Sequence, residues 1–380
     1  MNFYLTLNEE PIGLFESQIV DVVSFLDKEF KPEILLISFI SIRSYFKHRK
    51  IIKSYSVRSV VLPSFPKLIF FKFNILALFF LCFIYKPKGI IARNIFACFL
   101  AIKCRDFKFI SKVVYDGRGY MKAEAEEYKI FNDNVTKMIS GLEDIAVNCS
   151  DFVMAITKQM VHCWNSQYNY KKNNYVIIPN TLGENFNNLE IKLNDINLTR
   201  SSLGYKSDEI ILIYSGSTAK WQSIDNIIQF CRNQLQKNKK VKVLFLSKIT
   251  KELDQLINDY PARVSRMWLD SEGVSKYMMV CDYGLLLRTK SITNSVSFST
   301  KFAEYLSCGL KVITTNYMSI SDFVEINNAG LIIGDINFNT NLFKPKIDEK
   351  IRINNLAINN FNKNSPNNYK KYCQIMDIIS

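Results

Sequence analysis

Histidine is almost absent from this 380-residue chain, which contains only His48 and His162. The nine cysteines include no Cys-x-x-Cys pair and follow no regular spacing. Zinc sites are usually built from closely spaced cysteine and histidine ligands, so we expect no zinc site. Scattered thiols in an odd number, several of them inside apolar stretches, are typical of a protein from a reducing cytosol. A secretory leader is not expected either, because the opening MNFYLTLNEE carries acidic residues where a basic start and an apolar run are needed.

One long apolar run is present, residues 68–85, in which only Lys72 and Asn74 of 18 residues are polar. That length permits a short membrane span. A span here would separate the strand–helix patterns on its two sides, so we expect instead a helix that rests one face on a membrane surface. A wholly buried core helix is the alternative. The lysines that would anchor a surface helix are Lys67, Lys86 and Lys88.

Acidic residues are too few to balance the basic ones, with 35 Asp and Glu against 49 Lys and Arg and a formal charge of +14. Such a field attracts nucleic acid, anionic lipid or phosphorylated small molecules, and solubility alone is the alternative. No recognisable nucleic-acid-binding motif is present, so nucleic acid is not an expected partner. Residues 41–58 hold six basic residues and no acidic one, which favours an anionic membrane surface. The residues expected to face the membrane are Arg43, Lys47, Arg49 and Lys50.

Short apolar stretches alternate with helical periodicity, as over residues 124–147, along most of the chain. Such alternation predicts parallel sheets with helices on both faces, and therefore an α/β protein. The strands expected in the first half are residues 3–7, 33–39, 60–64, 89–93, 112–116, 152–156 and 175–179. Those expected in the second half are residues 210–216, 241–247, 264–269, 282–288, 311–315 and 330–334.

A polar, asparagine-rich stretch without a clear period interrupts this alternation near residues 181–208. We interpret it as the connection between two domains. The prediction is a Rossmann-like domain over residues 1–185, a second over 200–345, and a last helix over 365–380 that packs back on the first. Two doubly wound domains of this kind face a cleft, and ligands bind at the carboxyl ends of the strands. Residues that directly follow the strands are therefore the candidates for a site.

The sequence SFSTKFAEYLSCGLKVITT, residues 297–315, predicts a helix that starts near Thr300 and ends at Gly309, whose freedom at positive φ suits a C-cap. The start of this helix offers free N–H groups, the Thr300 hydroxyl and the Lys301 ammonium, a combination suited to a diphosphate. Glu304 lies one turn further on, where it can accept hydrogen bonds from ribose hydroxyls. The alternative is an ordinary capped helix with a solvated lysine and glutamate.

A second polar cluster follows the strand of residues 210–216 in IILIYSGSTAKWQSIDNII. Gly216 lets the backbone, Ser217 included, approach a phosphate closely, and Lys220 supplies a balancing charge. The spacing is not that of a Walker A loop. Arg288, at the end of the strand in DYGLLLR, is placed to stabilise a leaving diphosphate. A turn and surface cations explain each of these features equally well when it is taken alone.

A third cluster lies in the first half, where the strand in SKVVYDGRGYMKAEAEEY runs directly into a loop with two glycines, an acid and a base. Asp116 is a candidate to bind substrate hydroxyls or to act as a base, and Arg118 to hold a phosphate or to orient Asp116. A plain turn is the alternative. We expect the glutamates on the following helix to form a solvated face: Glu124, Glu126 and Glu127.

Together these pieces resemble the donor domain of the large family-four group of bacterial glycosyltransferases, also called glycosyltransferase group 1. The segments that carry the resemblance are YSGSTAK, CDYGLLL and STKFAEYLSCGLKVITT, with YVIIPNTLGENF, SDFVMAIT and IGLFESQIVDVVSFL in the first half. The resemblance covers nearly the whole chain and is most specific over residues 297–315 and 175–186. It implies a GT-B fold, a metal-independent reaction and, usually, retention of anomeric configuration.

The resemblance also implies a role for each matching residue. Lys220 and the amides after Gly216 would hold the diphosphate of a nucleotide-sugar. Thr300 and Lys301 would hold it from the other side, and Glu304 would bind the ribose.

Some positions set this chain apart from most of the group. Asp116 and Arg118 stand where many members carry a histidine that faces the donor sugar, and the resulting Asp-x-Arg-Gly loop resembles that of a subset making cell-surface polysaccharides. The group pattern has two glutamates eight positions apart, and Val296 occupies the first of these places. The arginine expected in the second cluster is Ser217, a lost charge for which Arg288 is a candidate replacement.

We therefore predict a hexosyltransferase-type glycosyltransferase that moves a sugar from a nucleoside-diphosphate sugar to a lipid-linked or glycan acceptor. The nucleotide-sugar is a substrate, and no cofactor is expected. No Asp-x-Asp pair suited to magnesium ends a strand, so no metal is expected. Capsule or lipopolysaccharide synthesis on the cytoplasmic face of the cell membrane fits this chemistry.

Fixed positive groups would stabilise the charge on the leaving diphosphate more in the transition state than in the ground state. In a retaining reaction the leaving phosphate itself takes the proton of the acceptor, and no positioned histidine is needed. If the reaction inverts, Asp116 is the candidate base. The alternatives are a nucleotide-sugar epimerase of the same fold and a catalytically inactive scaffold subunit.

Overall fold

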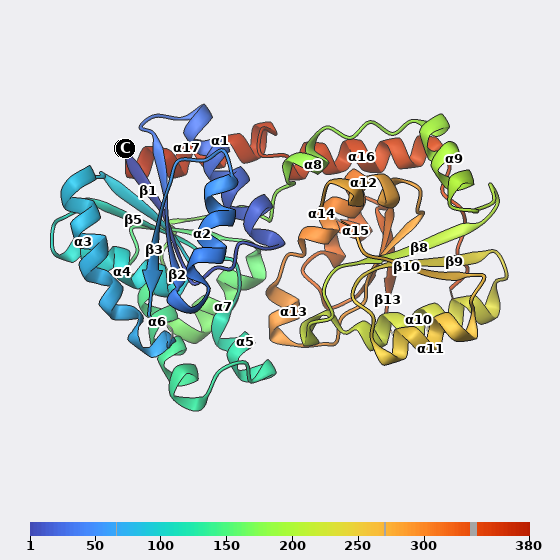
Figure 1. Ribbon diagram of the computed structural model, residues 1–380, viewed down its shortest axis with the longest axis horizontal. Coiled ribbons are helices and arrows are strands. Elements are labelled where there is room, and N and C mark those ends of the chain that lie inside the picture. Colours follow the sequence, from blue (N-terminus) through green and yellow to red (C-terminus); the bar gives the residue numbers. More distant parts are fainter. Residues whose placement is uncertain (66, 270, 335–339) are drawn as a thin grey trace. The chain divides into compact units, whose positions relative to one another are not determined.

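The computed structural model describes residues 1–65, 67–269, 271–334 and 340–380, and the chain divides into two compact units (Figure 1). Unit 1 comprises Met1–Gly183 and Lys363–Ser380, and unit 2 comprises Glu184–Asn362. Each unit is an α/β structure with its own parallel sheet and its own apolar core.

Unit 1 is built on a seven-stranded parallel sheet with the strand order β3-β2-β1-β4-β5-β6-β7. Its strands are near-continuous apolar runs, as expected where helices cover both faces of a parallel sheet. Their bounds are β1 Asn2–Leu7, β2 Ile34–Ser41, β3 Ser59–Ser64, β4 Gly89–Arg93, β5 Lys112–Asp116, β6 Phe152–Ala155 and β7 Tyr175–Ile177. The carboxyl ends of β1, β4 and β5 therefore lie next to one another in the middle of the sheet.

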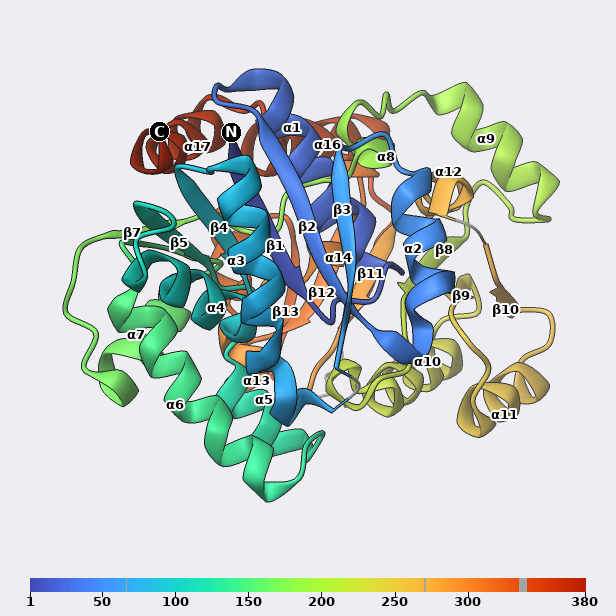
Figure 2. The same cartoon turned by 60° about the vertical axis from the view of Figure 1, so that its left-hand side comes forward.

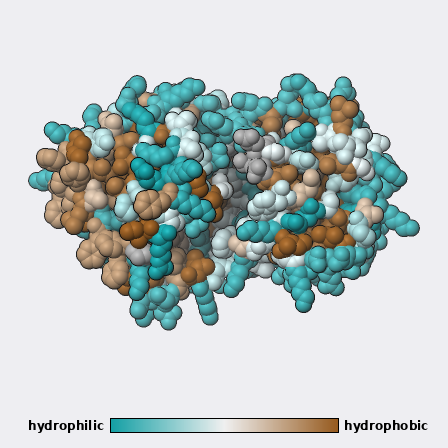
Figure 3. Space-filling model, viewed as in Figure 1, coloured by the Kyte–Doolittle hydropathy of each residue, from teal (hydrophilic) through white to brown (hydrophobic). Residues whose placement is uncertain are grey.

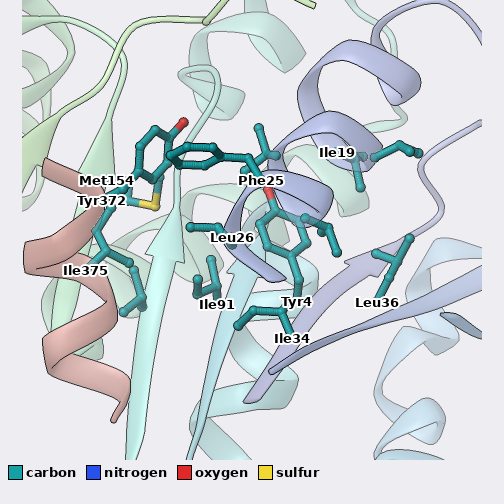
Figure 4. Close-up of a cluster of buried hydrophobic side chains, with 14 of the residues drawn as sticks. Tyr4, Ile19, Phe25, Leu26, Ile34, Leu36, Ile91, Met154, Tyr372 and Ile375 are labelled. Carbon is teal, nitrogen blue, oxygen red and sulfur yellow. The ribbon is translucent and has the colours of Figure 1, made fainter. Parts of the chain in front are cut away.

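The helices of unit 1 cover the two faces of this sheet. One face carries α1 (Asp21–Glu29, after the π-helical turn η1 Glu16–Val20), α2 (Tyr45–Ser54, after the 3-10 turn η2 Ile42–Ser44) and the C-terminal α17 (Pro366–Ile379). Tyr372 and Ile375 of α17 pack with Phe25 and Leu26 of α1 over Ile91 of the sheet (Figure 4). The other elements of unit 1 are η3 Leu68–Phe73, α3 Asn74–Tyr85, α4 Ile95–Asp106, α5 Met121–Tyr128, α6 Asp133–Cys149 and α7 Lys158–Tyr168.

Unit 2 is built on a six-stranded parallel sheet with the strand order β10-β9-β8-β11-β12-β13. The strands are β8 Ile210–Ser215, β9 Val241–Leu246, β10 Val264–Met267, β11 Tyr283–Leu286, β12 Lys311–Thr315 and β13 Gly330–Ile333. The helices are α8 Glu184–Asn187, α9 Leu193–Ser202, η4 Lys220–Gln222, α10 Ile224–Lys237, α11 Lys251–Asp259, α12 Ser271–Met279, α13 Ile292–Val296, α14 Thr300–Ser307, α15 Ser321–Ile326 and α16 Ile347–Phe361.

The expected doubly wound α/β fold is confirmed, and each expected strand lies within a few residues of an observed one. Two features of the helices differ from the sequence pattern. The stretch 181–208, which has no clear apolar period, contains α8 and α9. Helix α9 buries Arg200, whose guanidinium donates two hydrogen bonds to the Asp282 carboxylate at 2.7 and 2.8 Å. Arg200 thus occupies a buried position of α9 where an apolar residue is usual, so the apolar periodicity of the sequence did not indicate this helix.

The second difference is that the helical pattern over 124–147 is broken in two. Helix α5 ends at Tyr128, after which Lys129 takes a left-handed conformation with φ of 49°. Helix α6 then restarts behind Asn132, whose side-chain oxygen accepts a hydrogen bond from the Val135 amide at 3.0 Å. The capping residue Asn132 marks the start of α6, which the apolar periodicity of the sequence did not separate from α5.

Candidate functional site

In unit 2 the end of β8 lies directly against the start of α14. Gly216 follows the strand with φ of +143°, a conformation that favours glycine. A Cβ atom at this position would lie 2.1 Å from Cε and Nζ of Lys301. The absence of a side chain at Gly216 is therefore what lets the Lys301 side chain lie across the loop.

Helix α14 is held in place by Tyr305. The Tyr305 hydroxyl accepts a hydrogen bond from the Ser215 amide at 2.9 Å, which ties the helix to the end of β8. The ring occupies the space above Gly284 of β11, where a Cβ atom would lie 2.2 Å from Cδ2 of Tyr305. These contacts fix the helix start, which is at Thr300 as expected, and Ser299 provides no side-chain cap for its first N–H groups. The uncapped first turn is suited to an anion.

Two cationic side chains converge beside this helix start. Lys301 Nζ donates to Gln222 Oε1 at 3.0 Å, and a terminal nitrogen of Arg288 donates to the same oxygen at 3.2 Å. Arg288 is 5% exposed and also donates to the Ser297 hydroxyl at 3.0 Å. The Lys301 ammonium has no ion-pair partner among the residues that the structure describes, and it lies 4.9 Å from the centroid of the Tyr214 ring. Lys301 and Arg288 thus place two positively charged groups around the neutral side-chain amide of Gln222.

Burial is the main cause that lowers the pKa of Lys301 from 10.5 to about 7, and the nearby Arg288 lowers it further, against the opposing effect of Glu304. Burial likewise raises the pKa of Glu304 from 4.5 to about 7, while Lys301 opposes that rise. Within the described part of the chain the Glu304 carboxylate accepts no hydrogen bond and forms no ion pair. An anionic ligand would favour the charged form of Lys301, and hydroxyl groups that donate hydrogen bonds would favour the charged form of Glu304.

The remaining predicted residues of unit 2 take less central places. Ser217 is exposed, and its carbonyl accepts a hydrogen bond from the Tyr214 hydroxyl at 2.5 Å. Lys220 lies in η4 with an exposed side chain and is not part of the contacts that join Arg288 and Lys301. Val296, at the place of the missing glutamate, is fully buried.

In unit 1 the predicted loop after β5 belongs to a buried polar cluster. Asp116 is 0% exposed, and its Oδ2 accepts a hydrogen bond from the Tyr4 hydroxyl of β1 at 2.5 Å. Its other oxygen lies 2.6 Å from Nε of Arg118, and Arg93 of β4 lies 3.7 Å from Oδ2. Arg118 also donates to the Ile178 carbonyl at 3.3 Å. Asp116 is thus enclosed by its partners, whereas part of the Arg118 side chain reaches the surface.

The expectation that Glu124 belongs to a solvated face was wrong, although Glu126 and Glu127 are exposed. Glu124 is half-buried, and one of its carboxylate oxygens lies 2.4 Å from where a Cβ atom on Gly119 would be. Burial, followed by the charges of Glu9 and Glu127, raises the pKa of Glu124 to about 7. The sequence signal for this position was the glycine five residues earlier, which leaves room for the carboxylate.

The start of α5 is fixed by a further buried acid, Glu143 of α6. Its carboxylate accepts hydrogen bonds from the backbone amides of Met121 and Lys122 at 3.1 and 3.0 Å, and from the Tyr168 hydroxyl at 3.1 Å. A carboxylate at a helix start satisfies amides that have no partner within the helix. This arrangement sets the direction of α5 and hence the position of Glu124.

The basic residues expected to face a membrane are all exposed in unit 1. Arg43 lies in η2, and Lys47, Arg49 and Lys50 lie on α2. His48 of the same helix points inward and is buried. These exposed charges form the outer side of α2.

Comparison with known proteins gives the fold and a more distant relationship in sequence. No protein-family model matches the chain. It is 34% identical over 73 residues to the chitobiosyldiphosphodolichol beta-mannosyltransferase of Kluyveromyces lactis, a match covering 19% of this chain and 16% of that protein. It is 21% identical over 222 residues to the enzyme of the same name from Candida albicans, covering 54% and 46% of the two chains. The chain thus spans less than half the length of these curated relatives.

Solved structures match over almost the entire chain. HepE from Anabaena in complex with UDP superposes with a TM-score of 0.76 at 14% identity, covering 99% of this chain and 100% of that one. Sucrose-phosphate synthase from Thermosynechococcus elongatus gives 0.70 at 12% identity, covering 99% and 97%. The lipopolysaccharide glycosyltransferase WaaG gives 0.60 at 12% identity, covering 99% and 94%. The chain therefore has the GT-B fold of glycosyltransferases, as its motifs predicted.

Proposed function

We propose that the protein is a glycosyltransferase that takes a hexosyl group from a nucleoside-diphosphate sugar. The observation that carries this proposal is the arrangement at the start of α14, where Lys301 and Arg288 both donate to Gln222 beside uncapped amides. Positive charge placed before the ligand arrives is what a departing diphosphate requires, because it needs no reorganisation during the reaction. The GT-B fold supports the same assignment.

In this proposal the diphosphate binds between Gly216 and the α14 start. It takes the place of Gln222 as the partner of Lys301, while Arg288 stays charged at any pH and neutralises the leaving oxygens. Thr300 contributes its amide and hydroxyl, and the exposed Lys220 closes on the ligand from the surface. Glu304 accepts hydrogen bonds from the ribose hydroxyls, which a carboxylate makes about twice as strongly as a neutral group.

Unit 1 would bind the acceptor. Enclosed by Tyr4 and two arginines, Asp116 is suited to fix the orientation of Arg118. Arg118 then offers a fixed cation, and Glu124 offers a carboxylate with a pKa of about 7 for an acceptor hydroxyl. We propose retention, with the leaving phosphate accepting the proton of that hydroxyl.

A lipid-linked glycan is the proposed acceptor, and cell-surface polysaccharide synthesis at the cytoplasmic face of the membrane is the proposed setting. The matched relatives are named for transfer to chitobiosyldiphosphodolichol, which is a lipid-linked glycan. HepE was solved with UDP-glucose, which supports a uridine nucleotide as the first donor to try. No divalent metal is part of the proposed site.

A thermal-shift screen against nucleotides and nucleotide-sugars, run in buffer with EDTA, tests the donor site. A ligand at 100 times its dissociation constant should add about 2.7 kcal/mol to the stability of the protein. We expect a clear preference for one nucleoside-diphosphate sugar, and the shift should disappear in Arg288→Met. If no nucleotide or nucleotide-sugar shifts the transition, the donor site is wrong.

Measurement of substrate turnover then distinguishes the proposed transferase from an epimerase and from an inactive scaffold of the same fold. A putative UDP-N-acetylglucosamine 2-epimerase from Listeria monocytogenes shares the fold with a TM-score of 0.55. An epimerase would convert the free nucleotide-sugar without an acceptor, and an inactive scaffold would bind it without turnover. A transferase releases the nucleoside diphosphate only as the acceptor gains the sugar.

A further inference from the structure

The helical segment from Leu68 to Tyr85 in unit 1 exposes large apolar side chains on its outer side. It is long and apolar enough to cross a membrane by length and composition, yet only 28% of its 18 residues are buried. Leu76 is 69% exposed, Phe80 64% and Phe83 69%. A core helix would hide these side chains, so the wholly buried alternative does not hold.

The exposed apolar side chains of α3 are not the ones that pack against the rest of unit 1. The inner side of α3, formed by Asn74, Leu78, Leu81 and Cys82, is already buried and packs on α4. The outer residues Phe73, Leu76, Phe80 and Phe83 recur at spacings of three and four, which places them together on the opposite side. A helix that is apolar on both sides needs a second apolar environment outside the unit.

Neighbouring aromatic residues enlarge this surface. Phe65, after β3, has its ring 5.4 Å from that of Phe73, and Phe107, after α4, is 66% exposed and stands 5.3 Å from Phe79. Figure 3 shows apolar side chains gathered over the part of unit 1 that contains α3. We call this surface the α3 face. Its exposed members are Phe65, Ile69, Phe70, Phe73, Leu76, Phe80, Phe83, Ile84 and Phe107.

The charged residues of the segment that carries α3 are all of one sign, and Asp106, beside Phe107, is paired with Lys103 at 3.1 Å. Between residues 65 and 88 the chain has four lysines and no acidic residue. Lys72 lies with its Nζ 5.3 Å from the ring centroid of Phe99, at the border between the apolar surface and solvent. Lys88 donates to the backbone carbonyl of Ser380 at 2.8 Å, which fixes another exposed ammonium near the end of α3. The four lysines are Lys67, Lys72, Lys86 and Lys88.

We infer that the α3 face is a membrane-docking surface that inserts its phenylalanines among the acyl chains of an anionic bilayer. Aromatic and aliphatic side chains with lysines at both ends of the segment match a layer of hydrocarbon beneath negative headgroups. Docking of another protein would not require basic residues at both ends of the helix. Helix α3 would lie in the plane of the membrane interface. The protein would then bind its lipid-linked acceptor at the membrane in which that lipid is embedded.

The sheet rules out crossing of the membrane by this segment. The strands before and after it, β3 and β4, belong to the same seven-stranded sheet, so both must stay on one side. The length of the 18-residue segment formed by η3 and α3 would permit a crossing, so it is the shared sheet that excludes one. Helix α2 packs on β2 and β3, whereas α3 packs on α4 at a different place on unit 1 (Figure 2). The exposed bases of α2 therefore contribute longer-range attraction in this proposal.

Co-sedimentation with vesicles tests the inference on the full chain. The probes are phosphatidylcholine vesicles with and without about 30% phosphatidylglycerol, as a model of an anionic leaflet. The test variant is the triple Phe73→Ser, Leu76→Ser, Phe80→Ser. The matched control is Leu198→Ser with Ile326→Ser, which changes side chains of unit 2 that are 71% and 81% exposed.

We expect the wild type and the control to bind the anionic vesicles, and the triple variant to bind them at least about tenfold more weakly. Because the replaced side chains are already exposed, all three proteins should unfold at similar temperatures. The quadruple variant Lys67→Gln, Lys72→Gln, Lys86→Gln, Lys88→Gln should bind the anionic vesicles more weakly than the wild type, and this difference should be small at high salt. Nucleotide binding, measured separately by thermal shift, should be unchanged in the triple variant.

Three results would overturn the inference. The first is equal vesicle binding by the wild type and the triple variant, or no binding by the wild type. The second is a wild-type dimer in light scattering that the triple variant dissociates without any vesicle binding, which would assign the face to a second copy. The third is binding that resists alkaline carbonate extraction, which would indicate full insertion. None of these readouts requires turnover, so the glycosyltransferase proposal can stand or fall independently.

Discussion

Replacing Lys301 with methionine should stabilise the free protein while it weakens nucleotide binding. Lys301 Nζ lies between Gln222 and the ring of Tyr214, and its pKa is lowered to about 7 mainly by burial. Methionine has a similar length and no charge, so it removes the cost of holding an amine there. It also removes the cation that we propose for the diphosphate.

The size and the pH window of the effect follow from proton linkage. The folded pKa of about 7 lies below the ordinary 10.5, so the unfolded chain binds the additional proton between these values. The cost to stability is fully present below pH 7 and fades as the pH rises toward 10.5. A tenfold change in a proton-binding constant is worth about 1.4 kcal/mol, which sets an upper limit of about 5 kcal/mol. Because Lys301 keeps a hydrogen bond and some solvent contact, we expect a gain of about 1–3 kcal/mol at pH 7.

Chemical denaturation at pH 7 and pH 9.5, with calorimetric titration of the preferred nucleotide-sugar at pH 7, measures both effects. The stability gain of Lys301→Met should be larger at pH 7 than at pH 9.5, and nucleotide-sugar affinity should fall about 10- to 100-fold. Lys220→Met is the control, because its exposed side chain should leave stability unchanged and affect affinity less. Loss of stability in Lys301→Met, or unchanged affinity, would refute the reasoning.

Other substitutions address the remaining parts of the site. Glu304→Gln should weaken nucleotide binding about tenfold by calorimetry without loss of stability, and unchanged affinity would remove Glu304 from the site. Asp116→Asn and Arg118→Ala should lower kcat while nucleoside-diphosphate affinity stays near wild type, and full activity in both would show that their loop is only a turn. Gly216→Ala should displace Lys301, because the new methyl would lie 2.1 Å from its Nζ, and should weaken nucleotide binding. Wild-type affinity in that variant would mean that Lys301 does not need its observed position.

The sequence could predict the fold because local signals and tertiary structure agree. Most strands are apolar runs long enough for a parallel sheet, and each lies near its expected place. Helix α9 could not be predicted from apolar periodicity, because its packing rests on the buried pair of Arg200 and Asp282. The partner of that arginine lies 82 residues away, so no local pattern contains it.

The candidate site was predictable where strand ends meet a helix start. Gly216, Arg288 and Lys301 were all singled out from sequence, and the structure brings Lys301 to both of the others. Gln222, which bridges the two cations, could not be foreseen because a glutamine in a short turn carries no signal of its own. An exposed outer side for residues 68–85 was expected from the sequence, but apolar periodicity alone does not distinguish such a helix from a buried one, so the structure was needed to exclude the buried alternative.

The most direct test of the account is transfer itself. The purified protein is incubated with the nucleotide-sugar that the thermal-shift screen selects, together with a polyprenyl-diphosphate glycan in vesicles. Liquid chromatography follows the released nucleoside diphosphate, and mass spectrometry follows the lipid. The account predicts equal amounts of nucleoside diphosphate and of a lipid one hexose heavier, both lost in Arg288→Met. Binding of the nucleotide-sugar without any such transfer across a panel of lipid-linked and free glycan acceptors would contradict it.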